Sequence, residues 1–173
     1  RGVLRAVGDP ETRFCEDALR ILRAFRFCAR LGFEIEPQTL RGAAATASGL
    51  ARISVERIFA ELRQLLEAPH ADAGLAALCE AGCEKYVFFD TVSALDRSVR
   101  VDKMPQNAAL RLAVLLPTLD AGAAKALARR WHAPNAFGEA LAGYKGYGFA
   151  LAVEFFSSIL QGRCPQACGR VRT

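Results

Sequence analysis

The chain has 173 residues, of which 52% are hydrophobic and 24% are charged, enough for one ordinary domain or two small ones with a sizeable core. This composition excludes a disordered chain, and 14 Gly with 7 Pro exclude a collagen-like or linker-like one. The sequence holds no run of about 18 uncharged apolar residues, and its charged beginning lacks the apolar segment of a secretory signal. We therefore predict no membrane span. Because the first residue is Arg1, we expect a processed product or a piece of a longer polypeptide.

The net charge is +5, and residues 104–173 alone hold eight basic and three acidic residues. A local basic excess is typical of proteins that bind a phosphate-bearing partner such as RNA. The strong preference for Arg over Lys can also reflect genome composition, so charge alone leaves both interpretations open.

The six cysteines include two C-x3-C pairs, whereas structural zinc sites usually use C-x2-C or C-x4-C pairs. Without a secretory signal, disulfides are not expected either. We predict reduced thiols in a cytoplasmic protein, at Cys15, Cys28, Cys79, Cys83, Cys164 and Cys168.

The expected elements, taken in chain order, are almost all helical, since Ala is abundant, β-branched residues are scarce and strict alternation is nearly absent. Residues 2–7 are strand-like. One long helix follows over residues 10–31, with Asp9 as N-cap, Pro10 at the first position and Gly32 as the stop. Its apolar positions recur with helical spacing and should face a core: Phe14, Ala18, Ile21, Leu22, Phe25, Cys28 and Ala29.

Further helices are predicted along the rest of the chain, with Ser54 as a good N-cap of the third, and a second strand-like run covers residues 86–89. Trp131 is expected to be a core anchor at a helix end. Pro69 interrupts the pattern, and we predict two units, a neck over residues 1–68 and a helical body over residues 69–173. The predicted helices cover residues 37–48, 54–66, 70–81, 91–98, 106–115, 121–131, 135–144 and 150–160.

The polar stripe of the first helix is the sharpest candidate site. On one continuous helix, Asp17 and Arg20 would lie about 60° apart in projection and one turn along the axis. One interpretation is a set of surface ion pairs that stabilises the helix slightly. The other is base recognition, because a carboxylate only accepts and a guanidinium only donates hydrogen bonds.

Such a pair matches the edges of adenine and cytosine, which each show an amino donor beside a ring-nitrogen acceptor. Guanine and uracil show an oxygen acceptor beside a ring N–H, and they would leave polar groups unpaired. Arg23, Arg26 and Arg30 on the same stripe could then contact phosphates.

The residues around this stripe resemble the neck of class II tRNA nucleotidyltransferases, the CCA-adding enzymes and the related bacterial poly(A) polymerases. The resemblance consists of R-A-V-G-D-P at 5–10, R-F at 13–14, E-D-x-x-R at 16–20 and L-R-A-x-R-F at 22–27. It continues through L-G-F-x-I at 31–35, Thr39, I-S-x-E-R-I at 53–58 and Glu61-Leu62, and then weakens. It is therefore specific over residues 5–66.

The resemblance implies roles for individual residues. Asp17 and Arg20 would act as a protein template for the base of incoming CTP or ATP, and Glu16 would support Arg20. Arg13 would lie near the nucleotide pocket, and Arg23 would also belong to the nucleotide site. The matching segment with Ser54, Glu56 and Arg57 would be structural, capping a helix that braces the neck.

The chain departs from the family in one large respect, because no D-x-D pair is present. In the family, that pair belongs to a catalytic head domain, where it binds two Mg²⁺ for phosphoryl transfer. We therefore expect a neck and body that are inactive alone and that depend on a head elsewhere in the same polypeptide.

The expected activity of the whole enzyme is addition of CCA to tRNA 3′ ends. Poly(A) addition, CC-only or A-only activity and a non-catalytic helical RNA-binding or interaction module remain as alternatives. Weaker candidates for RNA contact are Arg129, Arg130 and Lys145.

Overall fold

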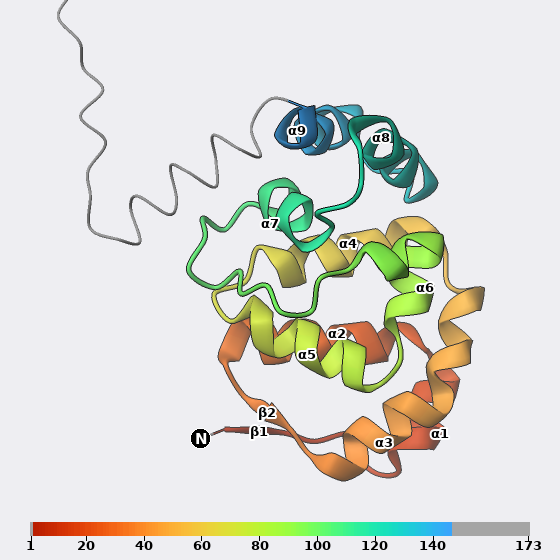
Figure 1. Ribbon diagram of the computed structural model, residues 1–173. Coiled ribbons are helices and arrows are strands. Elements are labelled where there is room, and N and C mark those ends of the chain that lie inside the picture. The colour runs from red at the N-terminus through yellow and green to blue at the C-terminus, as the bar shows by residue number, and fades with distance from the viewer. Residues whose placement is uncertain (1, 147–173) are drawn as a thin grey trace, which may run out of the picture.

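The structure is a computed structural model that describes residues 2–146 (Figure 1). Over these residues it is helical apart from one short parallel pair, β1 (Val3–Leu4) and β2 (Glu34–Ile35), in which Val3 lies opposite Glu34. The prediction of an all-α fold is confirmed. The helices are α1 (Pro10–Glu16), α2 (Leu19–Leu31), α3 (Pro37–Thr46), α4 (Val55–Leu66), α5 (Ala71–Glu80), α6 (Glu84–Phe88), α7 (Ala108–Leu115), α8 (Ala121–Arg130) and α9 (Asn135–Gly146), with 3₁₀ helices η1 (Ala47–Arg52) and η2 (Phe89–Ala94).

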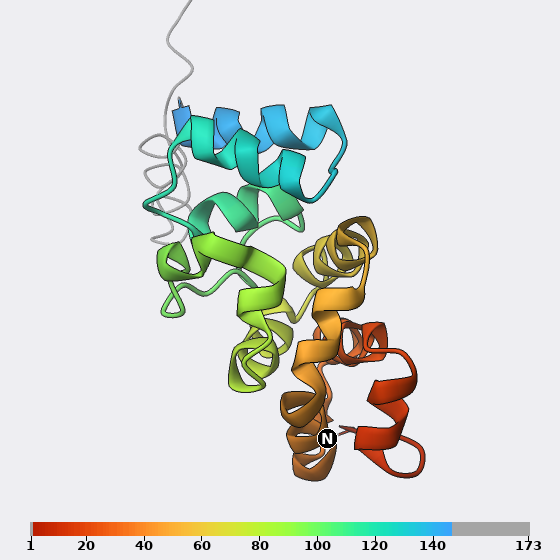
Figure 2. The same cartoon turned by 90° about the vertical axis from the view of Figure 1, so that its right-hand side faces the viewer.

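The helices are stacked along one long direction, as the two perpendicular views show (Figures 1 and 2). At one end α1 packs against α3 beside the β1–β2 pair, and at the other end α8 packs against α9. Between these ends, α2 packs against both α4 and α5, and α4 also contacts α7. The polar stripe of the sequence therefore lies at the β1–β2 end of the stack.

The core follows the helical periodicity of the sequence. Every apolar position predicted to face inward on the first helix is buried. Trp131 is fully buried as predicted, where its ring stacks on Phe59 at 5.6 Å between centroids and its Nε1 donates to the Val87 carbonyl at 2.8 Å. Buried apolar residues from both sides of Pro69 form one continuous cluster. The division into units 1–68 and 69–173 stays a prediction.

Local signals explain where several helices begin and end. Asp9 caps α1, since its carboxylate accepts the Thr12 amide at 2.8 Å, and Gly32 ends α2 with a positive φ of 65°. Helices α3, α4, α5, α7, α8 and α9 lie close to their predicted bounds. The helix predicted over residues 150–160 lies outside the described residues.

Three expectations about secondary structure are wrong. The single helix over residues 10–31 is two helices, α1 and α2, separated at Asp17. The strand-like run 86–89 covers the end of α6 and the first residue of η2. Val87 and Phe88 are fully buried, so the uninterrupted apolar character of the run reflects burial and not a strand. Residues 91–98 form only the end of η2 and a loop, in which Asp96 accepts hydrogen bonds from both the amide and the hydroxyl of Ser98. Such a local turn competes with a helix.

Cys15, Cys28, Cys79 and Cys83 are free thiols, while Cys164 and Cys168 lie outside the described residues. Burial raises the pKa of the Cys83 thiol to about 12, which keeps it protonated at neutral pH. Within residues 2–146, none of the helices is both long enough and apolar enough to cross a bilayer.

Candidate nucleotide-binding site

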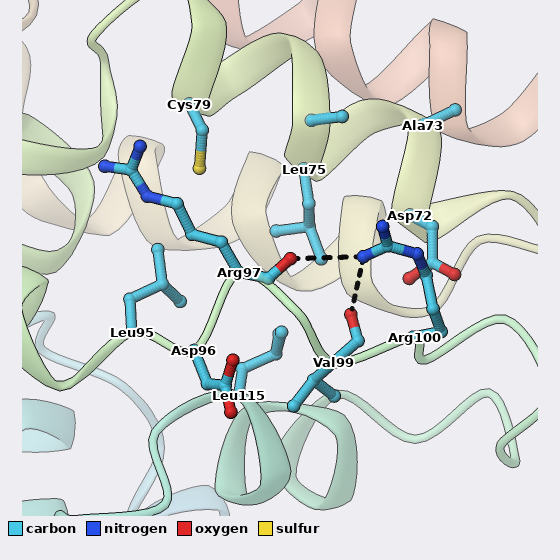
Figure 3. Close-up of a pocket in the computed structure, with 11 residues that line it drawn as sticks. Asp72, Ala73, Leu75, Cys79, Leu95, Asp96, Arg97, Val99, Arg100 and Leu115 are labelled. Atoms are coloured by element: carbon cyan, nitrogen blue, oxygen red, sulfur yellow. Dashed lines mark hydrogen bonds between the residues drawn. The ribbon is translucent and has the colours of Figure 1, made fainter.

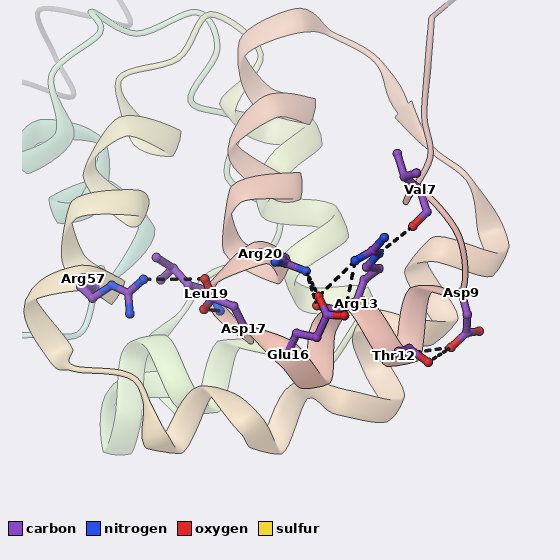
Figure 4. A network of polar contacts seen from close by, with 9 residues as sticks. All are labelled: Val7, Asp9, Thr12, Arg13, Glu16, Asp17, Leu19, Arg20 and Arg57. Carbon is purple, nitrogen blue, oxygen red and sulfur yellow. Dashed lines mark hydrogen bonds and ion pairs between the residues drawn. The ribbon is translucent and has the colours of Figure 1, made fainter.

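The break between α1 and α2 lies inside the E-D-x-x-R motif. Asp17 is extended, with φ −150° and ψ 102°, and one of its carboxylate oxygens, Oδ1, accepts the Leu19 amide at 3.1 Å. Its carbonyl accepts the Arg20 amide at 3.0 Å, so the residue forms the turn that starts α2 (Figure 4). The expectation that Asp17 and Arg20 are neighbours on one continuous helix is therefore wrong, because Asp17 belongs to neither helix.

Glu16 joins two arginines on the two sides of this break. Its Oε2 lies 2.5 Å from Nη1 of Arg20 and 3.3 Å from Nη1 of Arg13 (Figure 4). Arg13 also donates from Nε to the Val7 carbonyl at 3.1 Å, and Arg20 donates to the Arg13 carbonyl at 3.1 Å. The hydrogen bonds from Arg20 and Arg13 lower the pKa of the Glu16 carboxyl, so it is ionised at neutral pH. The structure thus places Glu16 where it orients Arg20.

Beside this network lies a cavity of about 430 Å³, here called the recognition cavity. Its charged lining includes Arg13, Arg20 and Arg23, and its apolar lining includes Phe14 and Phe27. The remaining lining comes from residues 4–7, Ala24 and Thr39. Asp17 and Glu16 are not among the lining residues. With Arg5 among residues 4–7, four arginines line this one cavity, and their positive charge favours a ligand with negative charge.

Arg57, on α4, reaches the motif from another helix. Its Nη2 lies 3.7 Å from Oδ2 of Asp17 (Figure 4). Ser54 and Glu56, the other two residues of this segment, differ from the expected capping arrangement. Ser54 is at the N-cap position of α4, but its side chain makes no capping hydrogen bond, and Glu56 instead lies 2.5 Å from Nδ1 of His132.

A second carboxylate, that of Glu61, contacts two further arginines. The sequence pointed to Glu61 only as part of the family resemblance. Glu61 of α4 is buried and faces α2, where it lies 2.6 Å from Nε of Arg26 and 3.3 Å from Nε of Arg23. Arg26, predicted as a candidate phosphate contact, is 14% exposed and its guanidinium lies over the Phe27 ring. Arg26 is thus a packed residue, and Arg23, with 48% exposure, is the one that lines the cavity.

The residues predicted to contact RNA lie at the opposite end of the stack (Figure 1). Arg129 and Arg130 are exposed in the last turn of α8, and the Arg130 guanidinium lies 4.2 Å from the centroid of the Phe89 ring. Lys145 is partly buried and donates to the Leu116 carbonyl, and burial lowers its pKa. The structure does not bring these three residues to the recognition cavity, and their contact with RNA stays a prediction.

A second cavity, of about 460 Å³, lies between α5, the loop over residues 95–100 and α7 (Figure 3). Leu75, Leu95 and Leu115 supply apolar walls. Arg100 donates to the carbonyls of Arg97 and Val99, which ties the loop to itself and not to the cavity interior (Figure 3). No sequence pattern pointed to this cavity, since its walls come from segments far apart in the chain.

No group of three or more His, Cys, Asp or Glu side chains within residues 2–146 could hold a metal ion. The described residues therefore do not fit the Mg²⁺ that the family resemblance implies.

Comparison with known proteins gives consistent results. Residues 32–95 match the family described as "Probable RNA and SrmB- binding site of polymerase A". The CCA-adding enzyme of Streptococcus pneumoniae (strain CGSP14) is 39% identical over 140 residues, which is 78% of this chain and 35% of that protein. The CCA-adding enzyme of Limosilactobacillus fermentum is 51% identical over 80 residues, 46% of this chain and 20% of that protein. The chain thus spans a fifth to about a third of the length of these relatives.

Among solved structures, the Bacillus stearothermophilus CCA-adding enzyme in complex with CTP matches with a TM-score of 0.74 and 32% identity, over 88% of this chain and 39% of that one. A tRNA nucleotidyltransferase complexed with a primer tRNA and an ATP analogue shares the fold, with a TM-score of 0.63, 19% identity and coverage of 92% of this chain and 54% of that one. The chain belongs to the class II tRNA nucleotidyltransferase family and corresponds to the helical neck and body region of its CCA-adding members.

Proposed function

We propose that this chain selects the incoming nucleotide in an enzyme that adds CCA to tRNA 3′ ends from CTP and ATP. The observation that carries the proposal is Arg20, held by Glu16 at 2.5 Å on the wall of the recognition cavity. The names of the relatives support the activity, and the CTP bound to the similar Bacillus stearothermophilus enzyme supports the kind of ligand.

Base selection follows from the groups that remain available at the motif. Arg20 uses Nη1 for both Glu16 and the Arg13 carbonyl, so its Nη2 can donate to the ring-nitrogen acceptor of cytosine or adenine. Asp17 would accept from the amino group of either base through its Oδ2, which lies 3.7 Å from Nη2 of Arg57. Guanine and uracil would place an acceptor against Asp17 and a donor against Arg20, which leaves buried polar groups unpaired.

Arg13 and Arg23 would face the phosphates of the same nucleotide, since both line the recognition cavity with Arg20. Phosphoryl transfer would require Mg²⁺ held by carboxylates of a head domain in the same polypeptide. We infer that the chain alone does not add nucleotides, because its described residues do not form a site for such ions.

We also infer that tRNA is the partner of the α8–α9 end. Arg129 and Arg130 would contact its phosphates there, with Lys145 as a weaker candidate. The basic excess over residues 104–173 supports this proposal, as does the primer tRNA bound to one protein of the same fold. A cytoplasmic location stays a prediction from the sequence.

The test compares Arg20→Ala with Arg30→Ala in the full polypeptide that carries this chain. Arg30 is also on α2 and exposed, but it does not line the recognition cavity. With a tRNA lacking its 3′ CCA and all four nucleotides present, Arg20→Ala should lower the preference for C and A over G and U about tenfold or more, and Arg30→Ala should not. Sequencing the products measures this preference.

Three outcomes would contradict the proposal. Normal fidelity and rate in Arg20→Ala would remove the base-recognition role. Long A tracts on the unmodified protein's products would indicate poly(A) addition. Robust CCA addition by the 173-residue chain alone would overturn the inference that it depends on another domain.

A further inference from the structure

Glu61 is a buried acidic residue on the face of α4 that meets α2. A buried carboxylate is costly unless it is paired, and Glu61 is paired with two arginines of α2, one helical turn apart. One oxygen is 2.6 Å from Nε of Arg26 and the other is 3.3 Å from Nε of Arg23. The contact with Arg26 is the shorter one, and the Arg26 side chain is less exposed than that of Arg23. The two arginines therefore have different roles.

Arg26 is the packed partner, with a 14% exposed side chain, a short contact to Glu61 and its guanidinium 4.4 Å from the Phe27 ring centroid. Arg23 is half exposed and uses only Nε for Glu61. Its two terminal nitrogens have no hydrogen-bond partner among the described residues. These nitrogens belong to a side chain that lines the recognition cavity.

The same arrangement occurs at Glu16, which holds Arg13 and Arg20 on the same cavity. Each carboxylate thus holds two guanidinium groups, and in each pair at least one arginine lines the cavity. An arginine fixed at Nε presents its two terminal nitrogens as a planar fork, which matches two oxygens of a phosphate.

We propose that Glu61 is a positioning residue that fixes Arg23 for the phosphate chain of the incoming nucleoside triphosphate. This inference rests on the proposed function, and it assigns Glu61 a role beyond joining α4 to α2. Asp17 and Arg20, the latter held by Glu16, would then read the base, while Arg23, held by Glu61, would bind the phosphates that CTP and ATP have in common.

Glu61→Gln in the full polypeptide tests this division. The amide keeps one acceptor but cannot hold two guanidinium groups through two oxygens. We expect KM for CTP and for ATP to rise by the same factor, about tenfold, with kcat within about twofold and the ratio of C to A incorporation unchanged. The matched control is Glu67→Gln, because Glu67 directly follows α4 and lies 3.3 Å from Nε of Arg63, an arginine that does not line the cavity.

A double-mutant cycle distinguishes positioning from helix packing. If Glu61 acts through Arg23, adding Glu61→Gln to Arg23→Ala should not raise KM further. Equal effects of Glu61→Gln in both backgrounds would overturn the proposal. Tighter nucleotide binding in Glu61→Gln would also overturn it, since the charge of Glu61 and not its positioning would then dominate.

Inhibition by tripolyphosphate and by cytidine separates the phosphate part of the nucleotide from its base and sugar. A general loss of stability would change both inhibition constants in the same direction. The Ki of tripolyphosphate should rise in Glu61→Gln, and that of cytidine should not. Parallel changes in both would contradict the positioning role. If the unmodified protein adds no CCA, the proposed function fails, but direct binding of tripolyphosphate to it and to Glu61→Gln still tests Glu61.

Discussion

Arg111 is fully buried, yet its direct partners are backbone carbonyls and not carboxylates. Nη1 donates to Leu66 and Ala68, each at 2.7 Å, and Nη2 and Nε donate to Met104 and Pro105 at 2.8 and 3.0 Å. Burial lowers its pKa, while the charges of Asp102 and Asp72 oppose that shift. One side chain therefore satisfies the carbonyls at the end of α4 and holds the loop before α7 against it.

Arg111→Met should destabilise the protein by about 3 kcal/mol, because it leaves several carbonyls without a donor in a buried place. Urea unfolding followed by circular dichroism measures the change. Arg129→Met, at an exposed position of α8, is the control and should change the free energy of unfolding by less than about 0.5 kcal/mol. A loss below about 1 kcal/mol in Arg111→Met would mean that water replaces the guanidinium.

At the scale of elements, the contact between α5 and α2 depends on the absence of one side chain. A Cβ at Gly74 of α5 would lie 2.7 Å from the Phe25 carbonyl oxygen and 2.8 Å from the Ala29 Cβ. Both neighbours belong to α2, and neither can rotate away. The two helices therefore approach closely only because residue 74 is Gly.

Gly74→Ala should cost about 1–3 kcal/mol, since α5 must move away from α2 to make room. Gly143→Ala is the matched control, because Gly143 is in α9 and a Cβ there would meet nothing within 4 Å. That variant should be stabilised by up to about 1 kcal/mol through helix propensity alone. Thermal unfolding of both variants checks the opposite signs, and a stabilised Gly74→Ala would refute the close-packing argument.

Periodicity and capping residues predicted most helices because these signals are local. Asp9 and Gly32 lie next to the ends that they mark, and the buried face of α2 repeats every three to four residues. The break at Asp17 was not predictable, since apolar residues continue with helical spacing through it. The carboxylate of the extended Asp17 accepts the Leu19 amide and pairs with Arg57 of the distant helix α4.

Long-range polar contacts in the candidate site were equally hidden. The motif and the resemblance pointed to Arg13, Arg20 and Arg23, which the cavity brings together. The sequence could not show that Glu61 meets Arg23 and Arg26, because 38 and 35 residues separate them. Arg111 gave no signal either, since its partners at the end of α4 lie 43 and 45 residues away.

At the scale of the whole molecule, α1, which supplies part of the wall of the recognition cavity, and α8, whose last turn carries exposed arginines, lie at opposite ends of the helix stack (Figures 1 and 2). Changes at the α8 end should therefore affect RNA affinity without changing the choice of nucleotide. Arg129→Gln in the full polypeptide should weaken tRNA binding and lower the slope of log affinity against log salt concentration by about one.

Arg63→Gln is the control for this prediction, because Arg63 is exposed but already paired with Glu67. Filter binding at several salt concentrations gives the slopes of all three proteins. An unchanged slope in Arg129→Gln would remove Arg129 from the RNA interface, and a changed ratio of C to A incorporation would contradict the separation of the two ends.

Three polar side chains of α4 contact residues of other elements. Glu56 meets His132 beside α8, Arg57 meets Asp17 at the motif, and Glu61 meets the arginines of α2. Glu56 and Arg57 are consecutive, and Glu61 follows roughly 6 Å further along the helix axis. Because all three side chains belong to one helix, a shift of α4 along its axis would change the contacts with His132, Asp17 and Arg23 together. The register of α4 therefore links the turn at Asp17 to the segment that follows α8.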